Sequence, residues 1–425
     1  MKTLSLFCTA ALLASSPVFA AQTLYQDFPS DVTPELSENG EYQVGVTTLT
    51  VNYPEPVMTL QGQAVERALT LEVWYPTNDS GAATTYDNQT RSGKEFSIQA
   101  DAIRDASVAD TQGTYPVVVL SHGYTGYRTI MYYLGEHLAS HGYIVAGIDH
   151  TDSTNEDVDF ANAPYAGFPS TLLNRSRDQV LTLNAVSENT LFKDVADPKN
   201  AGLIGYSMGG FGTVNTVGGC YDFSDEATAS FTGVKDPAVI SALQNALNTC
   251  AGGNANADSV DERWKAAMAL APWGGQHKVF SQQALNKINV PMLYVAGDHD
   301  DISGYQGIQW LFENTGNEST KLLTFKNARH NIAPHPAPKE AFGNEFDIGH
   351  YLEPAWRSET MNDINEHFAL AMMECHVKGK PEFCAYLDVE GDSGQVAVDG
   401  KVPEVWKGFD NRYALGLKME DKPKR

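Results

Sequence analysis

The chain has 425 residues, of which 42% are hydrophobic, and a formal net charge of −24 at pH 7. A chain of this length can bury a large core, either as one domain with insertions or as two smaller ones. So acidic a surface repels the phosphates of nucleic acids and the headgroups of anionic membranes. We therefore expect no nucleic-acid partner.

Residues 1–20 have the pattern of a secretory signal peptide. Lys2 precedes an apolar run, and small residues lie at the expected cleavage site between Ala20 and Ala21. No later apolar stretch is long enough to span a bilayer. The sequence therefore predicts a secreted or periplasmic protein whose mature part, residues 21–425, forms a single domain.

Four cysteines remain in this mature part, Cys220, Cys250, Cys375 and Cys384. An even number of cysteines in an exported chain indicates disulfides, and three pairings are possible. We predict the pairing that is local in sequence, Cys220–Cys250 and Cys375–Cys384. Four free buried thiols are the alternative, and neither spacing resembles a zinc site.

The first predicted strands cover residues 46–51 and 68–76, where apolar and polar side chains alternate. The following stretch, residues 78–112, is mostly polar and offers few core residues. From residue 116 onward, strand and helix patterns alternate, which is typical of a largely parallel sheet with helices on both faces. The later strands are expected at 116–120, 143–148, 201–204, 266–271, 291–296 and 321–325, with helices at 129–140 and 175–187.

The segment Gly-Tyr-Ser-Met-Gly-Gly, residues 205–210, matches the pattern G-x-S-x-G directly after a predicted strand. The pattern predicts a sharp turn from strand to helix, with Ser207 exposed at its apex as a nucleophile. Glycines at 205 and 209 remove Cβ atoms that would collide in such a turn. The backbone N–H of Met208, at the start of the helix, is free to bind an oxyanion. The motif alone is weak because glycine and serine are common.

A nucleophilic serine needs a base and an acid, which in this architecture follow it in the order acid, then histidine, each after a later strand. The strand 291–296 ends in Gly-Asp-His-Asp-Asp-Ile, and His330 lies directly beyond the strand 321–325. We therefore predict Ser207 as nucleophile, His330 as general base and Asp300 as the group that orients the imidazole. The alternatives are the carboxylates Asp298 and Asp301 for the acid, and His335 for the base.

A second oxyanion donor is expected in the loop Ser-His-Gly-Tyr-Thr-Gly, which follows the strand 116–120. Tyr124 offers its backbone N–H there, and His122 is expected to brace the loop. Trp273 follows the strand 266–271, so we expect it at the same edge of the sheet. There it is either a binding residue or a packing residue. No metal-ligand spacing is present; the acidic residues within 149–159 form a solvated loop or, as the alternative, a calcium site.

The segment SHGYTGYRTIMYYLGEHLASHGYIVAGID, residues 121–149, resembles the corresponding stretch of platelet-activating-factor acetylhydrolases and bacterial cutinase-like polyester hydrolases. Residues 205–210, 271–273 and 290–300 follow the polyester-hydrolase pattern in order, whereas residues 67–76 and 174–178 look more like predicted dienelactone hydrolases. The resemblance implies an α/β-hydrolase fold, with the acid, oxyanion and acyl-pocket roles on Asp300, Tyr124, Met208 and Trp273.

Two parts of the chain depart from compact polyester hydrolases. These are an insertion after the nucleophile helix, about 218–260, and a tail beyond residue 340, whose C-terminal extension covers about 359–425. The chain departs from dienelactone hydrolases in its nucleophile, because those enzymes use a cysteine and this chain has Ser207. The insertion lies near the site, so it could decide which ester enters.

Together these features predict a secreted carboxylic ester hydrolase that works through an acyl-enzyme on short-chain esters or polyesters, without a metal or organic cofactor. A phospholipid deacylase of the platelet-activating-factor acetylhydrolase type is the alternative. A peptidase, or a non-catalytic binding protein with the same fold, is a further alternative. Acyl chain length, leaving group and oligomeric state stay open.

Overall fold

The computed structural model describes residues 20–422, apart from positions 27, 30, 31, 61, 111, 112, 395–405 and 410–413. The predicted signal peptide thus lies outside the described residues, except for Ala20. Among the residues described, no helix combines the length and apolar character needed to cross a bilayer.

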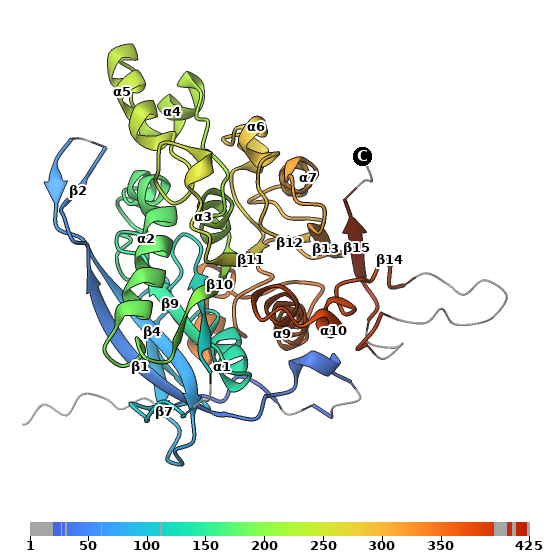
Figure 1. Ribbon diagram of the computed structural model, residues 1–425. Coiled ribbons are helices and arrows are strands. Elements are labelled where there is room, and N and C mark those ends of the chain that lie inside the picture. Colours follow the sequence, from blue (N-terminus) through green and yellow to red (C-terminus); the bar gives the residue numbers. More distant parts are fainter. Residues whose placement is uncertain are drawn as a thin grey trace, which may run out of the picture.

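A large twisted sheet forms the centre of the molecule (Figure 1). Its strands and those of two small hairpin sheets are β1 (Gln43–Asn52), β2 (Val57–Met58), β3 (Ala64–Val65), β4 (Ala68–Thr77), β5 (Thr85–Gln89), β6 (Glu95–Gln99), β7 (Ile103–Arg104), β8 (Tyr115–Ser121), β9 (Ile144–Asp149), β10 (Ala196–Tyr206), β11 (Trp264–Leu270), β12 (Met292–Gly297), β13 (Lys321–Phe325), β14 (Gly391–Asp392) and β15 (Leu417–Asp421).

The strand order in the large sheet is β14-β15-β13-β12-β11-β10-β8-β9-β4-β1-β7. From β13 to β9 all neighbours are parallel, whereas β15 at one side and β4 at the other run antiparallel to the strands they join. The prediction of a mostly parallel sheet is confirmed. Because parallel strands end at the same edge, the loops after β8, β10, β12 and β13 meet there.

Helices cover both faces of the sheet, as predicted. In the central strand β8, Val117 and Val119 pack into one core, and Val118 and Leu120 into the other. Helices α1 and α9 belong to the second core, and α2, α3 and α7 to the first. The helices are α1 (Tyr132–Ser140), α2 (Phe168–Glu188), α3 (Met208–Thr216), α4 (Asp225–Thr232), α5 (Pro237–Leu247), α6 (Gln282–Leu285), α7 (Tyr305–Asn314), α8 (Glu345–Ile348), α9 (Ser358–Met372) and α10 (Pro381–Cys384).

The interpretation of residues 78–112 as poor in core residues was wrong. They contain the β5–β6 hairpin, whose Tyr86, Phe96 and Ile98 are buried in the same core as α1. Each strand of this hairpin has only five residues, most of them polar. The alternation of apolar and polar side chains was therefore too short to be recognised in the sequence. The predicted helix at 129–140 also begins later, at Tyr132.

The segment 218–260 folds into α4 and α5, which project beyond α2 and α3 at one end of the molecule in Figure 1. Both predicted disulfides are present, Cys220–Cys250 across this segment and Cys375–Cys384 in the tail. The tail packs onto the domain through α9 and Trp406, and β15 extends the sheet.

Candidate active site

Ser207 lies at the turn between β10 and α3, with backbone angles of φ 54° and ψ −113°. A side chain at positive φ is strained, and such strain is typical of functional turns. A Cβ atom at Gly205 would collide with Gly209 and Thr213, and one at Gly209 would collide with Ser121. The glycines are therefore required by the turn, as their positions in the motif indicated.

The structure brings Ser207, His330 and Asp300 together from three separate loops. The Ser207 hydroxyl lies 3.0 Å from His330 Nε2, and His330 Nδ1 lies 2.9 and 3.1 Å from the two Asp300 oxygens. With the imidazole proton on Nδ1, His330 donates to the carboxylate and accepts from the serine. This is the arrangement that a general base needs.

Asp300 is the carboxylate of its loop that contacts His330. Its Oδ1 also accepts hydrogen bonds from the backbone N–H groups of Ile302 and Ser303. Burial alone would raise the pKa of Asp300, but the charge and hydrogen bond of His330, with these two N–H groups, lower it below the ordinary value. Asp300 therefore stays ionised where it accepts the hydrogen bonds of His330 Nδ1.

The alternatives for the acid and the base have other partners. Asp298 accepts a hydrogen bond from the backbone N–H of Asn327, and Asp301 is paired with Arg329. His335 is fully buried against Tyr127 and Pro336, with no contact to the serine.

The loop after β8 lies directly against the serine, since a Cβ atom at Gly123 would come within 2.9 Å of the Ser207 Cβ. The Gly123 carbonyl accepts a hydrogen bond from His122 Nδ1, at 2.5 Å, and another from the backbone N–H of Gly126, at 3.2 Å. The peptide bond that follows is trans, so the N–H of Tyr124 points away from these donors. The N–H of Met208 starts α3 and has no acceptor within the helix.

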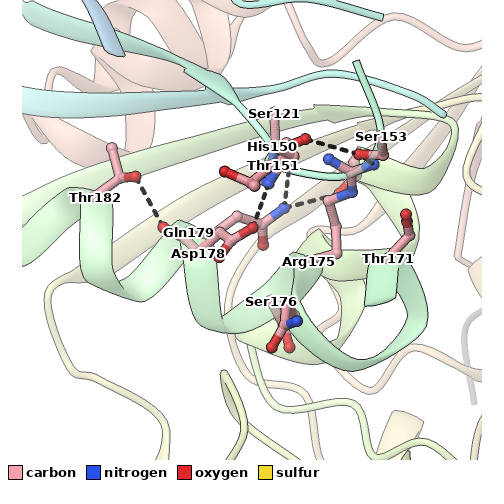
Figure 2. A network of polar contacts seen from close by, with 12 residues as sticks. Ser121, His150, Thr151, Ser153, Thr171, Arg175, Ser176, Asp178, Gln179 and Thr182 are labelled. Atoms are coloured by element: carbon pink, nitrogen blue, oxygen red, sulfur yellow. Dashed lines mark hydrogen bonds and ion pairs between the residues drawn. The ribbon is translucent and has the colours of Figure 1, made fainter. Parts of the chain in front are cut away.

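A buried network supports this loop from behind (Figure 2). His150 donates its backbone N–H to His122 Nε2, at 3.1 Å, and its ring bridges Ser121 and Asp178 at 2.8 Å on each side. Arg67 then binds Asp178 through two hydrogen bonds. Burial lowers the pKa of His150 to about 3, so the ring stays neutral and both of its nitrogens keep these roles.

Gln179 connects the network to the nucleophile turn. Its side-chain amide donates to Ser121 Oγ and to the Gly209 carbonyl, both at 2.9 Å. On the neighbouring turn of α2, Arg175 donates to Ser153, whose carbonyl accepts from the N–H of Thr125 (Figure 2). Helix α2 thus positions the end of β8 and the start of α3 relative to each other.

Ser207 and His330 open into a cavity of about 690 Å³. Trp273 lines it, and its ring packs against Phe168 at 5.5 Å and against Phe231 of α4 at 5.1 Å. The structure therefore places Trp273 at the cavity, and the segment 218–260 contributes a wall. Among the described residues, no three His, Cys, Asp or Glu side chains gather as a metal ion would require. In the acidic loop, Asp149 is instead paired with Arg128.

Tyr206 and Arg91 are among the cavity residues that sequence reasoning missed. Tyr206 packs its ring 5.3 Å from that of His330, and Arg91 of the β5–β6 turn reaches the cavity from a distant part of the chain. Tyr206 is adjacent to the serine in the motif, and this position could have indicated that it lies at the cavity. No sequence signal indicated Arg91, since it lies in a polar stretch without a catalytic pattern.

Comparisons with known proteins find similarities to ester hydrolases. A family described as platelet-activating factor acetylhydrolase, isoform II, matches residues 30–167. The platelet-activating factor acetylhydrolase of Cavia porcellus is 29% identical over 137 residues, which cover 30% of this chain and 31% of that protein. The chain thus spans about a third of the length of that relative.

Two further similarities extend over more of the chain. A solved ferulic acid esterase from Streptomyces cinnamoneus has a TM-score of 0.53 and 18% identity, over 80% of this chain and 91% of that one, which supports the fold. Cutinase est1 of Thermobifida alba is 33% identical over 267 residues, covering 60% of this chain and 70% of the cutinase. At this identity and coverage, the chain belongs to the α/β-hydrolase esterases.

Proposed function

We propose that the chain is an exported serine ester hydrolase with Ser207 as nucleophile, His330 as general base and Asp300 as the orienting acid. The observation that carries the proposal is the continuous set of contacts from Ser207 through His330 to Asp300, with the serine in a strained turn at the cavity. A serine with an oriented base next to a cavity can attack a carbonyl carbon.

In the first half of the reaction, Ser207 Oγ attacks the ester carbonyl carbon while His330 Nε2 takes the serine proton. The carbonyl oxygen becomes an oxyanion, which the N–H groups of Tyr124 and Met208 stabilise. His330 then gives its proton to the leaving alcohol, and the acyl group stays on Ser207. In the second half, water attacks the acyl-enzyme while His330 takes a proton from it; His330 then returns the proton to Ser207 Oγ as the acyl–oxygen bond breaks, and the carboxylic acid leaves.

The lining of the cavity supports short-chain esters or polyesters as the substrates. Its wall of packed aromatic rings, with Trp273 at the centre, suits an apolar acyl group. Tyr165, Ile302 and Phe346 line the cavity and are also among the exposed large apolar side chains. Exposed apolar residues at a site mouth favour an apolar substrate such as a polymer chain.

Deacylation of a phospholipid is the second candidate. The match of residues 30–167 to the acetylhydrolase family favours it, because that segment includes the loop with Tyr124. Hydrolysis of a polyester film compared with that of a phospholipid with a short sn-2 acyl chain would separate the two candidates.

The proposal also includes export of the protein. Its mature part, residues 21–425, is proposed to form a single domain, with an insertion at about 218–260 and an extension at about 359–425. Two disulfides support an oxidising compartment. N-terminal sequencing of the protein recovered outside the cytoplasm should begin at Ala21.

The test is Ser207→Ala, assayed on 4-nitrophenyl esters from acetyl to palmitoyl. We expect kcat to fall by roughly 10⁴-fold or more, with an unchanged melting temperature. A fluorophosphonate should label the wild type on Ser207 and leave the variant unlabelled. Full activity of the variant would refute the assignment, and an unlabelled, inactive wild type would favour the non-catalytic alternative.

A further inference from the structure

Arg91 brings a positive charge into the cavity that contains Ser207 and His330. It lies in the turn between β5 and β6, which is fastened to α8 by the next residues of the turn. Ser92 donates its backbone N–H and its hydroxyl to Asp347, at 2.8 and 2.6 Å, and Lys94 binds the same carboxylate at 3.1 Å. The turn therefore holds the Arg91 side chain in a defined place.

The guanidinium of Arg91 is only partly satisfied. It donates to Thr125 Oγ1 at 3.0 Å and lies 5.9 Å from the centre of the Phe346 ring. Its Nε is buried and has no hydrogen-bond partner in the described part of the chain. No carboxylate among the described residues lies within ion-pair distance of the guanidinium. Asp347, on the neighbouring helix α8, is bound by Ser92 and Lys94 instead. Donors of the guanidinium thus remain available.

The charge of the cavity is opposite to that of the molecule. The chain carries a formal charge of −24, yet the described residues that line the cavity include no Asp or Glu. Burial lowers the pKa of Arg91, and the nearby charge of Asp347 opposes only part of this shift. A buried cation without a counter-ion is costly, and an anion that enters with the substrate would offset that cost.

We propose that Arg91 binds an anionic group of the substrate, so that the preferred esters carry a carboxylate or a phosphate near the scissile bond. The planar guanidinium suits both groups, because it can offer two parallel hydrogen bonds. Its partner Thr125 follows Tyr124, which places the anionic group beside the oxyanion loop. The apolar part of the substrate would then lie against Trp273. This inference rests on the proposed ester hydrolase activity.

The test compares substrates that differ only in charge. For the carboxylate, the pair is the 4-nitrophenyl monoester of glutaric acid and 4-nitrophenyl pentanoate; for the phosphate, it is acetylated glycerol phosphate and acetylated glycerol. In the wild type at low ionic strength, kcat/KM for at least one anionic substrate should exceed that for its neutral partner by about 10-fold or more. Which pair responds identifies the anion.

Variants show whether Arg91 causes the preference. Arg91→Gln should lower the ratio of anionic to neutral kcat/KM by about 10-fold or more, and Arg91→Lys should keep part of it because the charge remains. Lys199→Gln is the control: it removes a positive charge from an exposed residue near the start of β10, outside the cavity lining, and should leave the ratio unchanged. Equal ratios in the wild type and Arg91→Gln, or an equal loss in Lys199→Gln, would overturn the inference.

A binding measurement separates this inference from the proposed function. Benzoate and inorganic phosphate are titrated calorimetrically into Ser207→Ala, with and without Arg91→Gln. We expect at least one anion to bind, and its Kd to rise about 10-fold or more when Arg91 is replaced. If no ester is hydrolysed but this loss is seen, the proposed function fails and the anion site stands. If esters are hydrolysed but neither anion depends on Arg91, only the anion site fails.

Discussion

Serine, histidine and aspartate meet twice in this molecule, and burial decides which set can act. Ser121, His150 and Asp178 are linked in the same order as Ser207, His330 and Asp300, but each is at most 1% exposed. No substrate can reach Ser121 there. The set with Ser121 instead supports the loop that faces Ser207. Similar contacts therefore give the buried set a positioning role, whereas the set with Ser207 is open to substrate.

The contacts of Asp300 lead to a prediction about the acidic loop. Asp300→Asn should lower kcat by roughly 10³- to 10⁴-fold, because an amide no longer holds the proton on Nδ1 of His330. Asp298→Asn and Asp301→Asn are matched controls in the same loop, and should change kcat by less than about 5-fold. Steady-state kinetics on one 4-nitrophenyl ester measures all three. A large loss confined to Asp298→Asn or Asp301→Asn would show that the acid is misassigned.

His122 gives a second prediction at this scale, through the Gly123 carbonyl that it holds. His122→Ala should lower kcat by about 10- to 100-fold with a smaller change in KM, because the N–H of Tyr124 loses its fixed direction. His122→Asn should restore part of the rate, since its amide can donate to the same carbonyl. If the asparagine variant were no better than alanine while both stayed folded, the carbonyl contact would not be the cause.

At the scale of elements, the two disulfides serve different parts of the fold. Cys220–Cys250 joins the end of α3 to the end of α5 across 30 residues, and α4 between them supplies Phe231 to the cavity. Cys375–Cys384 closes a short segment of 9 residues next to α9, away from the cavity. Loop closure should therefore stabilise the first segment and, with it, the aromatic wall.

Removing each pair tests this difference. Cys220→Ala with Cys250→Ala should cost about 3–4 kcal/mol of stability, and Cys375→Ala with Cys384→Ala about 2.5 kcal/mol. Only the first pair should also raise KM, because Phe231 loses its support. Denaturant unfolding and ester kinetics on both double variants provide the comparison. A raised KM in the second pair alone would contradict the role of α4 in the cavity.

Helix α1 contains a buried acid that makes stability depend on pH. Burial raises the pKa of Glu136 to about 8, although it accepts a hydrogen bond from Tyr86 at 2.6 Å. In the unfolded chain this carboxyl ionises near pH 4.5. The folded state therefore binds the extra proton between those values, and the stability from Glu136 is full below about pH 4.5 and lost as pH rises through about 8.

Glu136→Gln should remove that part of the pH dependence. Between pH 5 and pH 8 we expect the wild type to lose roughly 2–4 kcal/mol more stability than the variant, at about 1.4 kcal/mol per pH unit with a discount for residual solvation. Urea unfolding of both proteins at the two pH values measures the difference. Parallel pH profiles would show that Glu136 does not hold the extra proton.

Across the whole molecule, the parts predictable from the sequence are those in which a motif and its strand are adjacent in the chain. Ser207, His330 and Tyr124 each follow an apolar strand directly, so chain order and the parallel sheet were enough to predict where they meet. Arg91 depends on a hairpin that is held by contacts far away in sequence, among them the hydrogen bond from Ser92 to Asp347 of α8. Such a long-range contact leaves no local pattern, which is why the anionic preference could not be foreseen.

The distribution of charge gives the last prediction. With 53 acidic against 29 basic side chains, the carboxylates outnumber the cations that can pair with them, and their mutual repulsion destabilises the compact state. Salt screens this repulsion, so raising NaCl from 10 to 500 mM at pH 8 should raise the melting temperature by about 2 °C or more. At pH 5, where exposed carboxylates begin to bind protons, the same step should have less than half the effect. Calorimetry at both pH values measures the shifts, and a melting temperature at pH 8 that is flat or falls with salt would mean that the unpaired acids are too far apart to destabilise the fold.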